Sequence, residues 1–165
     1  MITIVFGLPG SGKSHFASWL ANLANADYIS SDRLRKGIHT AGNYSDQEKM
    51  AVYDEMLEQM KASLKENRNL VIDATFYKEA IRKKFVQEAG GADHIVFIEL
   101  IADETTISER LKRKRAFSDA DFEVYQKIKE QFEPMKQPHL VLHSTNENLP
   151  DMLKKAVSYL HINDD

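Results

Sequence analysis

The chain has 165 residues, a hydrophobic content of 42%, a charged content of 28%, a formal net charge of −3 and no cysteine. These values are typical of one globular domain. They exclude a disulfide framework, a thiolate metal site and a general electrostatic attraction to nucleic acid or anionic membranes. No apolar run reaches membrane-spanning length, and a strand is expected from residue 2 onward, so we expect a single cytoplasmic domain over residues 1–165, without an obligate protein partner.

The first predicted strand, Ile2–Phe6, is a continuous run of mostly apolar and β-branched residues, which is typical of a strand buried in a parallel sheet. It leads into Gly7-Leu8-Pro9-Gly10-Ser11-Gly12-Lys13-Ser14, which fits the phosphate-binding loop G-x-x-x-x-G-K-[ST]. A helix is expected to follow. The residues that it should bury are Phe16, Leu20, Leu23 and Ala24.

The residue types of this loop predict an ATP and Mg²⁺ site. Glycines let the backbone turn its N–H groups around an anion, and the helix beginning at about Lys13 adds the positive end of its dipole. Lys13 is then the charge for the β and γ phosphates, and the Ser14 hydroxyl is the Mg²⁺ ligand. His15 follows within the nucleotide-binding segment and is expected to point to solvent.

A short second strand, Asp27–Ser30, precedes a polar segment that contains Asp32 and Arg35. The ligand crevice of a parallel sheet lies beyond the carboxyl ends of its strands, so we predict that Asp32 is the general base for an acceptor hydroxyl. Alternatively, Asp32 only caps a short helix over residues 33–36. Arg35 either holds an anionic part of the acceptor or is an ordinary solvated arginine. Residues 37–44 are expected to form a loop.

A capping box, Ser45 with Glu48, opens the clearest helix of the chain. Its expected buried stripe is Met50, Tyr53, Leu57, Met60 and Leu64. The third strand, Asn69–Asp73, ends in a carboxylate. Asp73 either holds Mg²⁺ through water or binds the acceptor, with the satisfaction of a turn as the structural alternative, and Thr75 is assigned to the same acceptor site.

A helix from about Lys78, with Ile81 and Phe85 inward, should end at Gly90-Gly91, and a strand is expected within His94–Ile101. The next helix carries Ile107 and Leu111 and runs into the cationic segment Arg110–Arg115. Arg110 and Arg113 share a helical face. They could reach the transferring phosphate when a lid over about residues 110–135 closes, or they could belong to a solvated helix face.

The last part of the chain adds one more strand between two helices. Ser118 can cap a helix that Pro134 ends, Leu140–Leu142 is a fifth strand, and a helix closes the chain. The inward residues of the two helices are expected to be Phe122, Tyr125, Ile128 and Phe132, and then Leu149, Leu153, Ala156, Val157 and Leu160. His139 and His143 flank the fifth strand without a carboxylate partner nearby in the sequence, so we assign them surface or core roles.

Strands and helices therefore alternate along the chain, which predicts an α/β fold. We expect a three-layer α/β/α P-loop NTPase domain with a five-stranded, mostly parallel sheet and a small helical lid.

Four segments together resemble the small P-loop kinases related to polynucleotide 5′-hydroxyl kinase and zeta-toxin-like kinases. They are GLPGSGKS, SSDRLR, VIDATF and ERLKRKR. The resemblance implies that Asp32 is the base and Arg35 the substrate anchor, and it matches Asp73 to the family's strand-end aspartate. Its lid arginines match Arg110 and Arg113, although an arginine spacing of four would fall on Lys114. Gluconate-kinase-like relatives fit SSDRLR less well.

The expected activity is transfer of the γ-phosphoryl group of ATP to a hydroxyl of a small molecule or of a short nucleic-acid 5′ end, with Lys13, Asp32 and Arg110 as catalytic residues. The nucleic-acid end is less favoured, because the cations form only three islands, at residues 33–36, 82–84 and 110–115. The alternative is a nucleotide-dependent switch that hydrolyses ATP slowly and acts through a partner protein. The sequence leaves open whether the nucleotide is ATP or GTP, although no guanine-reading Asn-Lys-x-Asp segment occurs.

Overall fold

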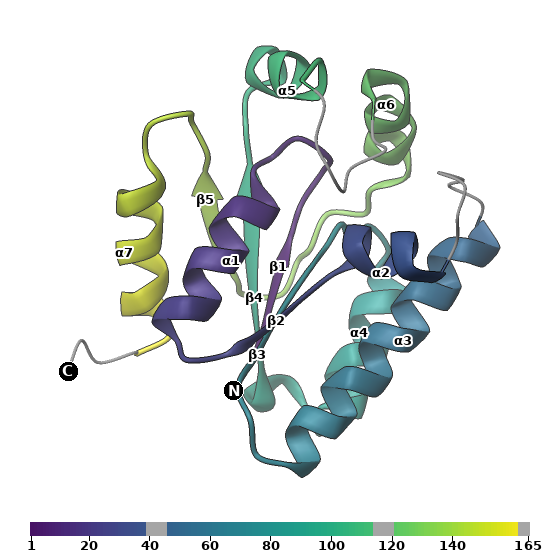
Figure 1. Cartoon of the computed structure of the whole chain (residues 1–165), viewed down its shortest axis with the longest axis vertical. Coiled ribbons are helices and arrows are strands. Elements are labelled where there is room, and N and C mark those ends of the chain that lie inside the picture. Colours follow the sequence, from purple (N-terminus) through teal and green to yellow (C-terminus); the bar gives the residue numbers. More distant parts are fainter. Residues whose placement is uncertain (39–45, 114–120, 162–165) are drawn as a thin grey trace.

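The computed structural model describes residues 1–38, 46–113 and 121–161, and it contains one five-stranded sheet (Figure 1). The strands are β1 (Ile2–Phe6), β2 (Asp27–Ser30), β3 (Leu70–Ala74), β4 (Ile95–Ile101) and β5 (Leu140–His143). They lie in the order β2-β3-β1-β4-β5, and every neighbouring pair is parallel. The predicted α/β fold is confirmed.

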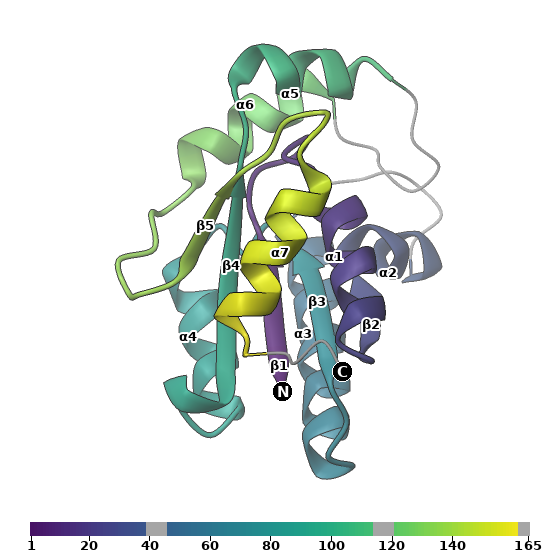
Figure 2. The same cartoon turned by 90° about the vertical axis from the view of Figure 1, so that its left-hand side faces the viewer.

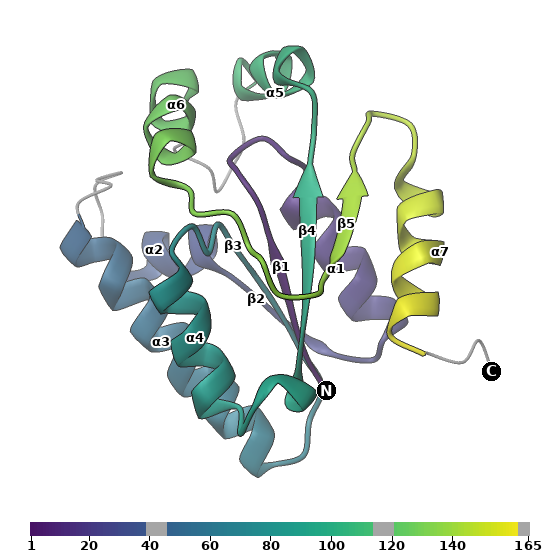
Figure 3. The same cartoon turned by 180° about the vertical axis from the view of Figure 1, so that it is seen from behind.

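Helices connect the strands and cover both faces of the sheet. They are α1 (Lys13–Leu23), α2 (Ser31–Ile38), α3 (Asp46–Lys65), α4 (Glu79–Glu88), α5 (Glu104–Leu111), α6 (Phe122–Gln131) and α7 (Leu149–Tyr159), with the short 3-10 helix η1 (Ala92–His94) before β4. Helices α1 and α7 lie on one face (Figure 2), and α3 and α4 on the other (Figure 3). Helices α5 and α6 lie beyond the carboxyl ends of the strands. Among the described residues, no helix has the length and apolar content needed to cross a bilayer.

The central strand β1 divides its side chains between two hydrophobic cores. Ile4 and Phe6 are fully buried on the side of α3 and α4, whereas Val5 is fully buried on the side of α1 and α7. Because alternate residues of a strand point to opposite faces, a run that is apolar throughout is the sequence expected for a strand covered on both sides. Because β1 is buried on both faces, it holds the loop that follows it in a fixed position at the carboxyl edge of the sheet.

Two of the predicted inward residues are exposed. Leu23 on α1 is 47% exposed and Met50 on α3 is 43% exposed, so these two assignments are wrong. Both residues lie at the edge of a buried stripe, because small or neighbouring side chains shift the centre of that stripe around the helix. The residues that line the two stripes are Phe16, Ala17, Leu20 and Ala21 on α1, and Val52, Tyr53, Met56, Leu57, Met60 and Ser63 on α3.

Two helix boundaries also differ from the prediction. Gly37 and Ile38 belong to α2, so the predicted loop begins later than expected, and its remaining residues lie outside the described parts. The cap of α6 is Asp121, whose side chain accepts a hydrogen bond from the backbone N–H of Val124. The two serines assigned to helix caps, Ser45 and Ser118, lie outside the described residues.

Candidate functional site

The loop between β1 and α1 needs glycine at two positions for reasons that the structure makes explicit. Gly7 has φ +149°, and a Cβ atom there would lie 2.3 Å from the carbonyl oxygen of Leu100 on β4. Gly12, the N-cap of α1, has φ +94°, and its Cβ would lie 2.9 Å from Ser144 Oγ. Side chains at these positions would push the loop away from β4 and from the loop after β5. The glycines therefore hold the N-terminus of α1 at the carboxyl edge of the sheet.

Lys13 and Ser14, the first two residues of α1, connect this loop to its surroundings. Lys13 Nζ donates a hydrogen bond to the carbonyl oxygen of Leu8, 3.1 Å away, and so spans its own loop. Ser14 Oγ donates to Asp73 Oδ2 on β3 at 2.7 Å, and Tyr28 Oη on β2 donates to the same oxygen at 2.6 Å. Three neighbouring elements thus meet at the Asp73 carboxylate.

The Asp73 carboxylate has an electrostatic environment unlike that of a surface aspartate. It is 2% exposed, and burial raises the pKa of its carboxyl group, which the positive charge of Lys13 and the hydrogen bonds from Tyr28 and Ser14 oppose. The Asp32 charge raises the pKa further. Burial of the Tyr28 hydroxyl, together with the Asp73 charge, raises the pKa of this hydroxyl. Tyr28 therefore keeps its proton and remains a hydrogen-bond donor.

The pair Ser14 and Asp73 has the donor chemistry that Mg²⁺ requires. Both side chains offer hard oxygen atoms, and their hydroxyl and carboxylate oxygens are 2.7 Å apart. Because Mg²⁺ keeps several waters and is completed by phosphate oxygens, one hydroxyl and one carboxylate suffice on the protein side. Within the described parts of the chain, no group of three or more histidine, aspartate and glutamate side chains could hold a metal ion.

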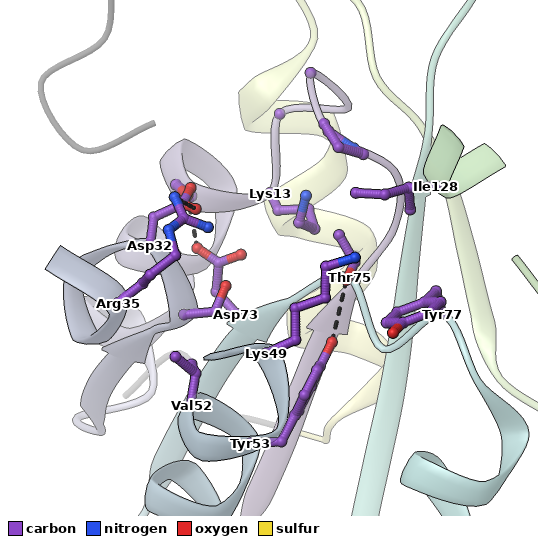
Figure 4. Close-up of a pocket in the computed structure, with 15 residues that line it drawn as sticks. Lys13, Asp32, Arg35, Lys49, Val52, Tyr53, Asp73, Thr75, Tyr77 and Ile128 are labelled. Atoms are coloured by element: carbon purple, nitrogen blue, oxygen red, sulfur yellow. Dashed lines mark hydrogen bonds and ion pairs between the residues drawn. The ribbon is translucent and has the colours of Figure 1, made fainter. Parts of the chain in front are cut away.

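Asp32 lies in the first turn of α2, directly after the carboxyl end of β2. Its Oδ1 is 3.0 Å from Nη2 of Arg35, and the side chain of Arg35 is only 9% exposed, against 31% for Asp32. The arginine therefore fixes the orientation of the carboxylate and leaves part of it open to the pocket. Figure 4 shows Asp32, Lys13 and Asp73 turned toward the same space.

One pocket collects most of the residues that the sequence assigned to phosphoryl transfer. Lys13, Ser14, Asp32, Arg35, Asp73 and Thr75 all line it (Figure 4). The sequence did not point to the rest of the wall, which is formed by Ser31, Lys49, Val52, Tyr53, Tyr77 and Ile128. Tyr53 was assigned to the core, and it is buried. Its hydroxyl nevertheless lies 3.1 Å from Thr75 Oγ1 and accepts from the backbone N–H of Phe76 at 2.8 Å.

A second pocket adjoins the first on the α1 and α7 side of the sheet. His15, Arg110 and Arg113 line it, and Gly12, Ser14 and Asp32 line both pockets. The sequence also missed residues of the loop after β5 that form this wall, namely Ser144, Thr145 and Asn146. Nothing in their local sequence distinguishes these residues from an ordinary polar loop.

Arg110 is buried at the end of α5 and is bonded to two other segments. Its Nη1 donates to the carbonyl oxygen of Gly10, its Nη2 to Ser144 Oγ and its Nε to Asn146 Oδ1, each at 3.1 Å. The side chain thus connects α5 with the phosphate-binding loop and with the loop after β5. Arg113 is exposed, while Lys114 and Arg115 lie outside the described residues.

One further expectation for a charged residue is wrong, and one histidine has a partner that the sequence did not indicate. His139 Nε2 lies 2.9 Å from Glu99 Oε1 on β4, the neighbouring strand. Arg82 does not belong to an accessible cationic island, because it is 3% exposed and its guanidinium bonds to the carbonyl oxygens of Phe76 and Glu133. These three contacts join residues more than five positions apart in the sequence, and periodicity cannot reveal them.

The family whose description is "AAA domain" matches residues 2–135 of this chain. Among curated proteins, uncharacterized proteins from Mycobacterium bovis (strain ATCC BAA-935 / AF2122/97) and Mycobacterium tuberculosis (strain ATCC 25618 / H37Rv) are each 31% identical over 87 residues. Each alignment covers 46% of this chain and 18% of the relative, so the chain spans less than a fifth of the length of these proteins.

Solved structures share the fold over nearly the whole chain at low sequence identity. A sugar kinase from Janibacter sp. HTCC2649 superposes with a TM-score of 0.75 at 18% identity, covering 98% of this chain and 94% of that one. A gluconokinase from Sinorhizobium meliloti 1021 gives 0.73 at 19% identity, with coverages of 96% and 90%. The APS kinase of Mycobacterium tuberculosis, in complex with AMPPNP and APS, gives 0.71 at 17% identity, with coverages of 97% and 96%.

Proposed function

The chain belongs to the AAA domain family, and from this premise we propose that it is an ATP-dependent kinase that transfers the γ-phosphoryl group to a hydroxyl of an acceptor molecule. The observation that carries the proposal is the convergence of Lys13, Asp32 and Asp73 on one pocket at the carboxyl edge of the sheet. A glycine-rich loop alone would support nucleotide binding only. A carboxylate facing the same space adds a group that can act on an alcohol.

On the donor side, the loop amides and the N-terminus of α1 bind the β and γ phosphates, and Lys13 adds a positive charge. Lys13 now contacts Leu8 O and would exchange that neutral acceptor for a phosphate oxygen. Ser14 and Asp73 would hold Mg²⁺, which when bound neutralises charge on the β and γ oxygens. The second pocket, with His15, Arg110 and Arg113, would take the rest of the nucleotide. In this proposal the segment of about 110–135 is the lid.

On the acceptor side, Asp32 would accept a hydrogen bond from the reacting hydroxyl. As the acceptor oxygen forms its bond to the γ-phosphorus and the bond to the β–γ bridging oxygen breaks, the hydroxyl proton passes to the Asp32 carboxylate and ADP leaves. Arg35 would keep this carboxylate in place through the 3.0 Å ion pair. Thr75 would contact the acceptor from the end of β3.

The acceptor proposed is a small molecule, with a short nucleic-acid 5′ end as the less favoured alternative. A polynucleotide needs a cationic path several nucleotides long. Arg35, Arg82 and Arg110, one from each cationic island, are 7% exposed or less. The neighbouring folds named a sugar kinase and a gluconokinase act on small acceptors by their names, and this supports the same class here. The likeness to polynucleotide 5′-hydroxyl kinase and zeta-toxin-like kinases stays a prediction.

The proposal is tested by measuring ADP release with ATP and Mg²⁺ across a panel of sugars, nucleosides, antibiotics and 5′-hydroxyl oligonucleotides. We expect at least one acceptor to accelerate ADP release over the acceptor-free rate. Asp32→Asn should lower the acceptor-dependent kcat by about 10²- to 10⁴-fold and leave nucleotide affinity unchanged. Lys13→Ala should abolish nucleotide binding.

Asp54→Asn is the matched control, because Asp54 is an exposed carboxylate of α3 whose partner, Lys84, is also at the surface. Full acceptor phosphorylation by the Asp32→Asn variant would show that the base is another group. Slow ATP hydrolysis that no acceptor accelerates, and that survives Asp32→Asn, would favour the nucleotide-dependent switch.

A further inference from the structure

Lys49 projects from the first turns of α3 into the acceptor side of the pocket. It stands one helical turn before Tyr53, and both side chains line the cavity together with Thr75 (Figure 4). The phosphate-binding loop forms another wall of the same cavity. A molecule whose hydroxyl reaches Asp32 and Lys13 can therefore extend toward Lys49.

The charge of Lys49 is not matched by a carboxylate in the described parts of the chain. Its Nζ lies 5.3 Å from the centre of the Tyr77 ring, and no aspartate or glutamate oxygen of residues 1–38, 46–113 or 121–161 lies within 4.0 Å of it. Asp46, one turn earlier on α3, acts instead on the Tyr77 hydroxyl, whose pKa is raised by burial and by the Asp46 charge. The aromatic face favours a cation but leaves the ammonium donors available to a ligand.

The other two cations of the pocket have contacts that suit different tasks. Arg35 is bound to Asp32 at 3.0 Å, and Lys13 spans the phosphate-binding loop to Leu8 O at 3.1 Å. Phosphate binding at the loop and orientation of the base already explain these two residues. Lys49 is the cation of the pocket that neither task explains.

A pair of hydroxyl groups, from Tyr53 and Thr75, lines the same pocket as Lys49. The Tyr53 hydroxyl oxygen accepts a hydrogen bond from the backbone N–H of Phe76 at 2.8 Å and lies 3.1 Å from Thr75 Oγ1, where either hydroxyl can be the donor. When Tyr53 donates to Thr75, the Thr75 hydrogen can point into the pocket. An ammonium group and a hydroxyl that line the same pocket can together bind an anion.

We propose that the phosphate acceptor carries an anionic group, a carboxylate or a phosphate ester, which Lys49 and Thr75 bind while the acceptor hydroxyl faces Asp32. The inference rests on the proposed kinase function and specifies the chemical class of its substrate. It makes Lys49 a substrate-binding residue that selects anionic acceptors over neutral ones of the same size.

The test compares acceptors that differ by one anionic group. The pairs are glucose with gluconate, glucose with glucose 6-phosphate, and ribose with ribose 5-phosphate, each assayed for ADP release and for its effect on the melting temperature. We expect the anionic member of at least one pair to be the better acceptor and the stronger stabiliser. A preference for gluconate would indicate a carboxylate site, and a preference for the sugar phosphates would indicate a phosphate site.

Three variants connect that preference to one side chain. Lys49→Ala should raise the KM of the anionic acceptor by about 10- to 100-fold, the effect of losing a hydrogen bond between charged groups, without changing the KM of ATP. Lys49→Arg should recover part of the loss, and Lys49→Glu should bind the anionic member worst. Lys61→Ala is the control, since Lys61 lies on the same helix but pairs with Glu58 and Glu88 outside the pocket.

The outcomes separate this inference from the kinase proposal. Stabilisation by an anionic compound that depends on Lys49, without any ADP release, would support the anion site and contradict kinase activity. Equal use of neutral and anionic acceptors, with the same response to Lys49→Ala, would overturn the anion site and support the kinase. A rise in the KM of ATP alone, or no effect of any pair on rate or melting temperature, would also overturn the anion site.

Discussion

At the scale of single residues, the arrangement around Asp73 combines a proposed functional role with a cost in stability. The carboxylate is buried at the end of β3 and receives both of its side-chain hydrogen bonds, from Ser14 and Tyr28, on one oxygen. The buried position keeps the carboxylate away from water, and a charged group is less stable in the protein interior than in water. In the proposed function this cost is necessary, because the carboxylate can hold a cation near phosphate only in its charged form.

Asp73→Asn is therefore expected to make the ligand-free protein more stable at neutral pH. Burial raises the folded-state pKa above the ordinary value of 3.8, so over the window from 3.8 to the raised value the folded state holds more protons than the unfolded chain. The free energy of unfolding then falls as the pH rises through that window, by about 1.4 kcal/mol per pH unit. The asparagine carbonyl oxygen can still accept both hydroxyl hydrogen bonds.

Thermal unfolding of wild type and Asp73→Asn between pH 4 and 8 measures this effect. The melting temperature of the variant should exceed that of wild type increasingly as the pH rises, and the difference should become constant above the raised pKa. Asp151→Asn is the control, since Asp151 forms an exposed pair with Lys155. A variant that is less stable than wild type at pH 7 would mean that the charged carboxylate contributes more through its hydrogen bonds than it loses by burial.

The residues of the site differ in how well they can be predicted from the sequence. Asp32 and Asp73 stand directly at the ends of predicted strands, and the topology of a parallel sheet brings such positions to one edge. Tyr28 and Lys49 stand inside a strand and a helix, where local patterns describe them equally well as core or surface residues. Their contacts to Asp73 and Tyr77 join different elements, so only the folded chain reveals them.

At the scale of secondary-structure elements, Arg110 connects three segments that are distant from one another in the sequence. It extends from α5 to Gly10 of the phosphate-binding loop and to Ser144 and Asn146 after β5. The sequence prediction treated this arginine as a group that reaches the transferring phosphate. In the ligand-free chain the same side chain supports the loop that would bind that phosphate, and the two roles predict different behaviour of a variant.

Arg110→Ala should destabilise the protein in the absence of any nucleotide. The change leaves the carbonyl of Gly10 and the hydroxyl of Ser144 without their donor in a buried region, at a cost of about 1–3 kcal/mol. For a chain of this size that corresponds to a decrease of the melting temperature by about 2–12 °C. Differential scanning calorimetry of the ligand-free protein provides the measurement.

Arg113→Ala is the matched control for Arg110→Ala, because Arg113 lines the same pocket but is exposed. Its melting temperature should equal that of wild type. If Arg110→Ala also melted at the wild-type temperature and lost only its turnover, the side chain would act on the nucleotide alone, and the structural role would be excluded.

The elements themselves were predicted well, and the errors have a common cause. Each strand was placed within one residue of its observed bounds, because buried parallel strands are short apolar runs between polar turns. Leu23 and Met50 were assigned to buried faces because they fit a helical period, yet they stand at the edges of the buried stripes. Periodicity predicts that a buried stripe exists, but which residues at its edge are covered depends on the neighbours that the helix meets in the folded chain.

At the scale of the whole molecule, the strand order explains why the two pockets are neighbours. Strand β1 lies at the centre of the sheet, between β3 and β4, so the loop that follows it stands between the residues after β2 and β3 and the loop after β5, which line the two pockets. Gly12, Ser14 and Asp32 line both pockets. The pattern of a single sequence predicts a parallel sheet, but the order of its strands depends on crossovers that leave no local signal.

This central position predicts that a bound nucleotide stabilises the chain as a whole. A ligand that contacts the loop after β1, Arg110 and the loop after β5 connects segments from both ends of the sequence, and it binds the folded state only. At 100 times its dissociation constant, Mg²⁺-ADP should add about 2.7 kcal/mol to the free energy of unfolding and raise the melting temperature by about 5–11 °C. Lys13→Ala, which removes the phosphate contact, should melt at the same temperature with and without Mg²⁺-ADP. An equal shift in both proteins would mean that the nucleotide binds away from the phosphate-binding loop, and the placement of the donor site would then be wrong.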